Sequence, residues 1–128
     1  MKIEDQDLLL KALCGRLPYW VKCVAISDGY IGCISSIESQ YGVVTSDDGR
    51  QEEICDIKPY LFPLSSMTEE QYGEYTDMGY SVTERWWSMA NYHQIDWCNK
   101  NHFDYRGLIE KGLAIDATGL NIYKEETK

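Results

Sequence analysis

The stretch from Trp97 to Ile109 holds the densest set of side chains that could do chemistry. Aromatic rings stack on flat ligands, and Arg, Lys and His hold anions. We therefore predict a pocket that stacks a flat ring and binds an anion, with Trp86 and Trp87 as further contributors. Its predicted ligand-binding residues are Trp97, Asn99, Lys100, His102, Tyr105 and Arg106. The alternative is that Trp97, Phe103 and Tyr105 are core anchors and that Arg106 pairs with an acidic residue.

Cys98 and His102 suggest a different chemistry, because a spacing of four brings two side chains together on a helix. A thiol beside an imidazole is one way to activate a nucleophile. The competing interpretation is a buried cysteine next to a histidine at a helix end. Nothing else in the chain resembles a hydrolase signature, so we assign no catalytic residue.

Arg106 follows Tyr105 and precedes Gly107 in what we interpret as a short helical turn, with Asp104 as its N-cap and Gly112 at its end. Backbone N–H groups at the start of such a turn attract anions. Arg106 would then complete a site for a phosphate or carboxylate. Alternatively, the Arg106 guanidinium has only a structural role and holds this turn of the chain in place.

Metal, phosphate and cofactor motifs are missing from the sequence. The five cysteines are too far apart to form a C-x-x-C pair, so we predict no metal site and no cofactor. The glycines lack the pattern of a phosphate-binding loop. These absences favour a binding protein over an enzyme.

The chain has 128 residues and a net charge of −9. This charge argues against direct binding to nucleic acid or to an anionic membrane. It leaves open a basic protein partner, which the chain would meet as a DNA mimic. We find no signal peptide and no apolar run of the length that spans a membrane. With an odd number of cysteines, these features predict a reducing cytosol.

The length predicts one domain over residues 1–128. We expect an α+β fold with a helix in 1–18, a β-rich part in 19–64, a helical part in 65–112 and a short hairpin in 113–123. The pattern of the β-rich part predicts a small, twisted antiparallel sheet, which is either open or closed into an SH3-like barrel. Turns are predicted at Ser27-Asp28-Gly29 and at Asp47-Asp48-Gly49.

Pro59 and Pro63 are expected to end the strand ladder, since proline donates no hydrogen bond. Capping boxes beginning at Ser66 or Thr68 predict a helix to about Met78, and one beginning at Ser81 predicts a helix to about Phe103. The predicted core consists of Leu9, Leu13, Val21, Cys23, Ile34, Val43, Ile57, Leu61, Trp97, Phe103, Leu108 and Ile109.

Three segments, residues 8–19, 56–68 and 96–109, resemble small uncharacterised proteins from phages and prophages of gut Bacteroides-type bacteria. The resemblance implies a phage-type protein expressed in a bacterial host cytosol. That group has no settled activity, so the resemblance assigns a role to no residue.

We therefore expect a non-enzymatic, phage-type accessory protein that blocks or sequesters a host component, as in counter-defence. The partner would be a host protein or a nucleotide-like small molecule. The alternatives are a small Cys/His-dependent enzyme and a structural or assembly protein that forms a homo-oligomer through an open sheet edge.

Overall fold

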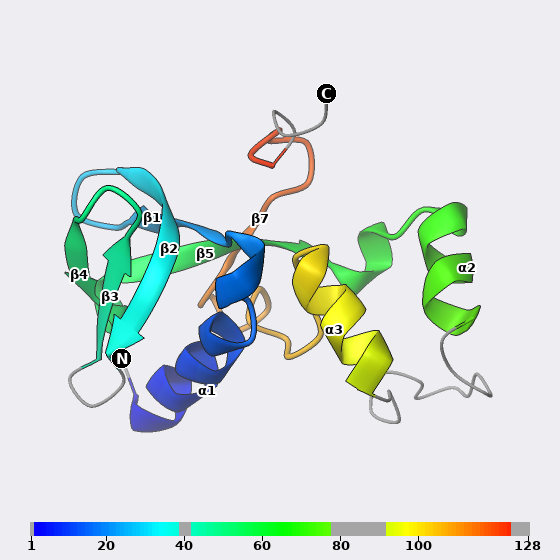
Figure 1. Ribbon diagram of the computed structural model, residues 1–128, viewed down its shortest axis with the longest axis horizontal. Helices are drawn as coiled ribbons and strands as arrows, with labels where there is room; N and C mark the ends of the chain where they lie inside the picture. Colours follow the sequence, from blue (N-terminus) through cyan, green and yellow to red (C-terminus); the bar gives the residue numbers. More distant parts are fainter. Residues whose placement is uncertain (1, 39–41, 78–91, 124–128) are drawn as a thin grey trace.

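The computed structural model describes residues 2–38, 42–77 and 92–123. Within these ranges the chain forms an α+β fold, as predicted, with a curled sheet at one end, the first helix against it and the later helices at the other end (Figure 1). The helices are α1 (Ile3–Cys14), α2 (Glu69–Asp77) and α3 (Tyr92–Lys100), and the 3-10 turns are η1 (Leu17–Tyr19), η2 (Ile54–Asp56) and η3 (Leu64–Ser66). The strands are β1 (Lys22–Ala25), β2 (Ile31–Glu38), β3 (Val43–Ser46), β4 (Gln51–Glu53), β5 (Ile57–Pro63), β6 (Phe103–Asp104) and β7 (Ile115–Asp116).

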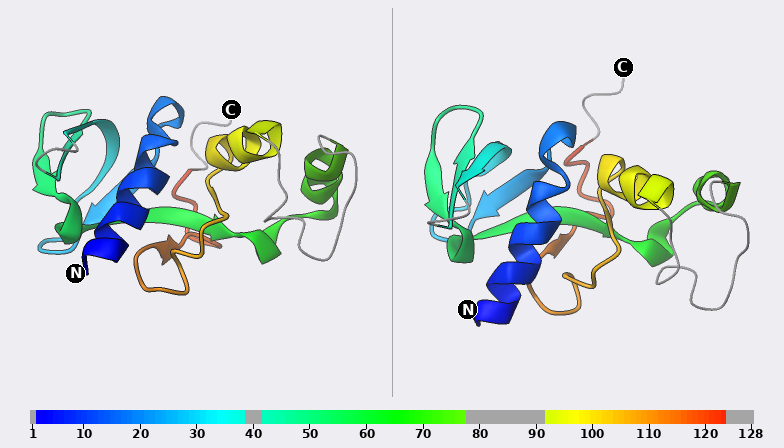
Figure 2. Two further views of the ribbon diagram at one scale, coloured as in Figure 1. Left: turned by 90° about the horizontal axis from the view of Figure 1, so that it is seen from below. Right: turned by 60° about the horizontal axis from the view of Figure 1, so that its bottom comes forward.

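Helix α1 lies across the sheet and buries Leu9, Ala12 and Leu13 (Figure 2). These residues lie on one face of the helix because their spacing follows the 3.6-residue repeat. They pack against Val21 and Leu61 in the larger core cluster. Helix α1 therefore shares the larger core cluster with residues of β1 and β5, the two strands at the centre of the fold.

The sheet follows the order β4-β3-β2-β1-β5-β6, with β7 also pairing with β5. Pairing is antiparallel from β4 to β5, whereas β6 and β7 pair with β5 in parallel. The sheet is thus mixed rather than antiparallel throughout, and it is not closed into a barrel. The predicted turns form at both sites, and Gly29 and Gly49 have positive φ angles of 78° and 92°.

Strand β5 corrects the expectation that Pro59 and Pro63 break the ladder. Pro59 is buried and lies opposite Cys23 of β1, while Pro63 lies opposite Asp104 of β6. A proline lacks only its own N–H, so it fits a strand where the neighbour does not need that donor. Strand β5 therefore continues as the central strand that joins the curled sheet to the helical end (Figure 1).

The hairpin predicted in 113–123 is wrong. Ile115 and Asp116 form β7 beside Tyr60 and Leu61, and residues 120–123 form no strand. The Ala117 N–H donates to the Leu61 carbonyl at 2.8 Å, which holds this segment on β5. Residues 115–116 therefore pair with β5, which is distant in the sequence, and not with residues 120–123 as the predicted hairpin required.

A second core cluster lies at the helical end and contains Tyr75, Trp97, Cys98 and Phe103. The Thr68 capping box of α2 forms, because Thr68 and Gln71 exchange hydrogen bonds of 2.9 and 3.1 Å. Ser66 instead donates its hydroxyl to the Pro63 carbonyl at 2.7 Å. The capping box predicted at Ser81 lies outside the described residues, as do Trp86 and Trp87.

All predicted core residues are buried except Val43 and Ile109, which are half-buried. In β3 it is Val44 that points inward, because side chains alternate between the two faces of a strand and the register places Val44 opposite Ile37. The helix predicted to reach Phe103 ends at Lys100, and Phe103 lies in β6. His102 breaks the helix with a positive φ of 65°.

Candidate functional site

The predicted site residues divide between the core and a pocket. Trp97 lies in the second core cluster, where its ring stacks on Phe103 with centroids 5.4 Å apart. Tyr75 meets the same indole edge-on at 5.7 Å, and the indole N–H donates to Glu74 at 3.2 Å. The Trp97 side chain is thus a core anchor, and its polar atom already has a partner.

Asn99 and Tyr105 bind each other. The Tyr105 hydroxyl donates to Asn99 Oδ1 at 3.0 Å, and the Asn99 side chain is buried against Gly15. A Cβ at Gly15 would lie 3.0 Å from Asn99 Nδ2, so a larger residue there would displace the Asn99 side chain. The pair joins the end of α1 to the segment after α3.

Arg106 is exposed, and its guanidinium carbon lies 5.3 Å from the Tyr105 ring centroid. The buried Asp104 accepts hydrogen bonds from the N–H groups of Arg106, Leu108 and Ile109, at 3.3, 3.0 and 2.9 Å. These N–H groups were expected to attract an external anion. The chain's own carboxylate occupies that position instead, and Gly112 ends the turn with a φ of 77°.

Arg16 holds in place the corner of the chain formed by Phe103, Asp104 and Tyr105, a role that sequence reasoning missed. Only 1% of Arg16 is exposed. Its guanidinium donates to the carbonyls of Ala12, at 3.1 Å, and Phe103, and lies 5.3 Å from the Tyr105 ring centroid. Burial lowers the Arg16 pKa, while Tyr105 and Asp104 oppose that shift. The sequence places an arginine at a helix end, where exposed arginines are common, so nothing local indicates burial.

His102 and Lys100 are the two predicted residues that border a large open pocket of about 850 Å³. Figures 1 and 2 show η1 and α3, which contribute to its walls, side by side. The lining residues share an aromatic and polar character. They are Tyr19, Trp20, Lys22, Cys33, Phe62, Ser66, Gln71, Lys100, Asn101, His102, Phe103, Thr118, Gly119 and Tyr123.

The charge of this pocket is opposite to that of the whole chain. Lys22 and Lys100 line it, and none of the described lining residues is an Asp or Glu. The full sequence holds 21 acidic residues against 12 basic ones. The amides of Gln71 and Asn101 add further donors and acceptors. An anion entering the pocket therefore meets no carboxylate among the lining residues that the structure describes.

Two residues of the pocket have backbone conformations that non-glycine residues rarely adopt. Trp20 has a φ of 62° and His102 a φ of 65°. Such angles cost on the order of 1–2 kcal/mol for a side chain with a Cβ, and strain of this kind gathers at functional sites. Trp20 also keeps 61% of its surface exposed, which leaves a large ring at the pocket wall open to a ligand.

The His102 imidazole is fixed by Tyr123. The two rings stack with centroids 3.8 Å apart and planes 9° apart. The Tyr123 hydroxyl accepts from the Lys22 N–H at 2.9 Å and donates to the Tyr60 carbonyl at 2.8 Å. Burial, followed by the charges of Arg16 and Lys22, lowers the His102 pKa to about 4. The imidazole is therefore neutral at pH 7.

Cys98 and His102 do not form the arrangement expected of a thiol nucleophile. The helix ends between them, so the spacing of four no longer places them on one helical face. Cys98 is buried, and that burial raises its pKa to about 12. A reactive thiol needs a lowered pKa and access to solvent.

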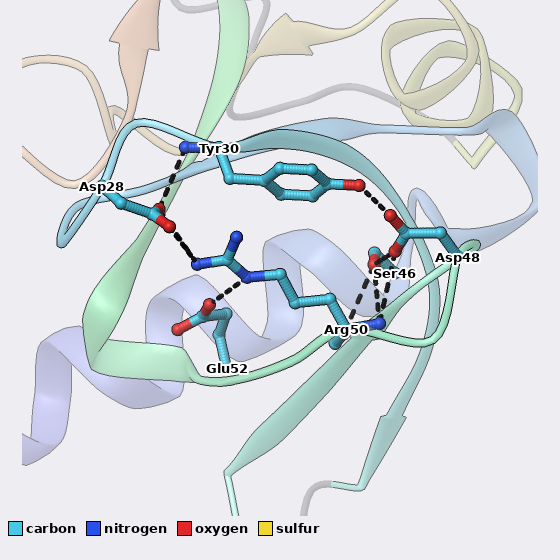
Figure 3. A network of polar contacts seen from close by, with 6 residues as sticks. All are labelled: Asp28, Tyr30, Ser46, Asp48, Arg50 and Glu52. Carbon is cyan, nitrogen blue, oxygen red and sulfur yellow. Dashed lines mark hydrogen bonds and ion pairs between the residues drawn. The ribbon is translucent and has the colours of Figure 1, made fainter.

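A polar network at the end of the curled sheet is the other concentration of charged groups (Figure 3). Arg50 Nη2 lies 2.8 Å from Asp28, its Nε lies 2.6 Å from Glu52, and its guanidinium carbon lies 4.6 Å from the Tyr30 ring centroid. Ser46 donates to Asp48, as does Tyr30, and these bonds lower the Asp48 pKa to about 2. The charges satisfy one another, so the network stabilises two turns.

Next to this network, Glu53, Cys55 and Asp56 bring three potential metal-ligand atoms within 4.8 Å of one another. Partial burial, then Asp56 and Glu53, raise the Cys55 pKa. A raised pKa opposes the thiolate form that binds metals.

Neither the known protein families, nor the curated proteins, nor the solved structures include a match to this chain. Among the described helices, none combines the length and the apolar character needed to cross a membrane.

Proposed function

We propose that the protein is a non-enzymatic binding protein that captures a planar, anionic small molecule of the nucleotide type in the pocket beside His102. One observation carries this proposal. The pocket combines aromatic walls with two lysines and no described carboxylate, in a chain whose net charge is −9. Chance placement in so acidic a protein would be expected to put Asp or Glu on a surface of this size.

The two features of the pocket select the two halves of such a ligand. Stacking of a flat base on an aromatic side chain contributes roughly 1–3 kcal/mol, and exposed Trp20 offers such a surface. A hydrogen bond to a charged group contributes about 1.5–3 kcal/mol. Lys100 supports this second contribution, because it forms an ion pair with none of the described residues. A cationic aromatic ligand would instead be repelled by both lysines.

The proposed biological role is that of a phage-type accessory protein that sequesters this molecule in the cytosol of a bacterial host. It rests on the resemblance of three segments to phage and prophage proteins. Binding without turnover fits the absence of a catalytic motif in the sequence.

Each of the other candidate functions meets an observation that weakens it. An enzyme using Cys98 would need a reactive thiol, but the Cys98 pKa is raised to about 12. Assembly through the β4 edge would place Glu52 and Glu53 against a second copy, and charged residues on a short edge strand discourage such pairing. Of the acidic residues that a DNA-mimicking face could use, Asp28 and Glu52 are both already paired with Arg50.

The test is direct titration with nucleoside 5′-monophosphates and with the matching nucleosides, followed by tryptophan fluorescence and thermal stability. Trp20→Ala should weaken binding by about tenfold or more, and Trp20→Tyr should retain most of it. Ile31→Ala is the matched control, since Ile31 is also an exposed large residue but does not line the pocket.

A second arm denatures the protein purified from host cells and identifies any released small molecule by mass spectrometry. The proposal predicts an aromatic anion in this fraction. If no nucleotide or nucleoside binds and no aromatic anion is released, the proposed function is wrong.

A further inference from the structure

His102 occupies a position that another residue would fill at lower cost. The chain leaves α3 through hydrogen bonds from Asn101 N–H to Trp97 and from His102 N–H to Asn99, and His102 then adopts a φ of 65°. Its carbonyl accepts from the Phe62 N–H at 2.8 Å, which begins the pairing with β5. Gly or Asn adopts this conformation more readily than His. The imidazole itself therefore needs an explanation.

The Tyr123 stack holds the imidazole so that only one of its nitrogens can meet a ligand. Nδ1 is sealed from solvent and has no hydrogen-bond partner among the described residues. His102 as a whole is only 8% exposed, yet it lines the pocket. Nε2 is therefore the ring nitrogen that a bound molecule could reach.

For the neutral imidazole to donate a hydrogen bond into the pocket, its proton must lie on Nε2, because Nδ1 is sealed. The charges of Arg16 and Lys22 both act on this ring and oppose additional positive charge there. Arg16 Nε is likewise a buried side-chain nitrogen without a hydrogen-bond partner among the described residues.

Lys22 brings a full positive charge to the same end of the pocket. Its Nζ lies 5.9 Å from the Tyr123 ring centroid and donates to the Ile122 carbonyl at 2.9 Å. The buried Arg16 adds a second cation behind His102. This end of the pocket thus combines a fixed neutral donor with two fixed positive charges.

We infer that the His102–Tyr123 end of the pocket is an anion subsite, in which His102 Nε2–H donates to a phosphate, sulfonate or carboxylate of the ligand while Lys22 supplies the charge. This assignment rests on the proposed function and deepens it, because it states which end holds the anion. The aromatic ring then extends toward Trp20, the exposed ring on the same pocket wall. Ligands of this class are rings that carry one compact anionic group.

The experiment compares two probes with the same ring, naphthalene-2-sulfonate and neutral naphthalene-2-sulfonamide, by calorimetric titration at pH 7. The wild-type protein should bind the sulfonate about tenfold or more tightly, as expected for one charge-assisted hydrogen bond. His102→Phe keeps a flat ring able to stack on Tyr123 but removes the donor. Lys22→Met keeps most of the side-chain stem but removes the charge.

Both variants should reduce the preference for the sulfonate to within about threefold while sulfonamide binding changes little. Lys58→Met is the matched control, because Lys58 lies in the same sheet but does not line the pocket. Thermal unfolding checks that each variant is folded. The comparison of the two probes on the wild-type protein does not depend on any variant.

The outcomes separate the subsite from the proposed function. Binding of both probes with equal affinity by the wild-type protein would overturn the anion subsite and leave a pocket for rings. Retention of the full sulfonate preference in His102→Phe and Lys22→Met would overturn the assignment of these two residues. Binding of neither probe, together with failure of the nucleotide titration, would remove the proposed function as well.

Discussion

The imidazole of His102 lies parallel to the phenol ring of Tyr123, with the two centroids 3.8 Å apart. This contact joins the segment just after α3 to the C-terminal end of the described chain. The same tyrosine holds β1 and β5 through its hydroxyl. One side chain thus positions the pocket's histidine and ties the C-terminal segment to the central strands.

Tyr123→Phe keeps the ring but removes the hydroxyl. The Lys22 N–H and the Tyr60 carbonyl would each lose a partner, in a part-buried position. We expect a loss of roughly 1–3 kcal/mol in the free energy of unfolding, measured by urea denaturation. Tyr105→Phe removes a hydroxyl with one partner, Asn99, and should cost less. Equal stability of the wild-type protein and Tyr123→Phe would contradict these two bonds.

Replacing His102 by Gly and by Ala isolates the backbone strain at this position. Both variants lose the stack on Tyr123, but only Ala keeps a Cβ at a φ of 65°. His102→Gly should therefore be more stable than His102→Ala by about 1 kcal/mol, measured by urea denaturation. At Asp7, an exposed position within α1, the same pair should show the reverse order, because Gly weakens a helix by about 1 kcal/mol.

The stability of the protein should fall as the pH drops from about 6.5 to 4. The folded-state pKa of His102 is lowered to about 4 by burial, Arg16 and Lys22, whereas an unfolded histidine titrates near its ordinary value of 6.5. In this pH window His102 is protonated in the unfolded chain but not in the folded chain. The free energy of unfolding therefore falls by up to about 3 kcal/mol. Above pH 6.5 this contribution is constant.

Urea denaturation at pH 7, 6, 5 and 4 measures this effect. His102→Phe should lack the part of the pH dependence that comes from the imidazole, while carboxylates such as Asp48 contribute below this window in both proteins. An identical slope in the variant and the wild-type protein would show that His102 is not the titrating group.

Arg16→Lys and Arg106→Lys compare a buried and an exposed arginine in the same corner. The lysine at position 16 cannot reproduce the planar fork that reaches the carbonyls of Ala12 and Phe103, so a buried acceptor is left unsatisfied. We expect a loss of about 1–3 kcal/mol, or a melting temperature lower by roughly 4–10 °C. Arg106→Lys should change the melting temperature by less than about 2 °C. A larger effect at Arg106 would mean that Arg16 does not fasten the corner.

The thiol of Cys98 should react far more slowly than that of Cys14 in the folded protein. Cys14 is exposed, whereas Cys98 is buried with its pKa raised to about 12. Reaction with a chromogenic disulfide at pH 8, read by peptide mass spectrometry, gives the rate at each cysteine. Rapid modification of Cys98 before that of Cys14 would revive the thiol enzyme as a candidate.

Local patterns in the sequence determined the features that depend on neighbouring residues. The helical spacing of Leu9 and Leu13 identifies the buried face of α1. Gly49 supplies the positive φ of the hairpin turn, and Thr68 with Gln71 begins α2 through a capping box. In each case the physical cause lies within one or two turns of chain, so the sequence contains the whole argument.

The packing between distant segments decided the rest. Whether Val43 or Val44 faces inward depends on the register with β2, and a shift of one residue exchanges the two faces. Pro59 fits within β5 because the neighbouring strand does not require a hydrogen bond from a backbone N–H at that position. The burial of Arg16 depends on Phe103 and Tyr105, which lie far along the chain.

The candidate site was predictable in kind but not in place. The sequence determined that the Trp97–Arg106 stretch combines rings and cations, and it supplied His102 and Lys100 to the pocket. Only the tertiary structure brought Trp20 and Tyr123 beside His102 and turned Trp97 into the core. The reason is physical: a helix, strand or turn is fixed by contacts within a few residues, whereas a pocket is the surface left between segments that meet only after folding.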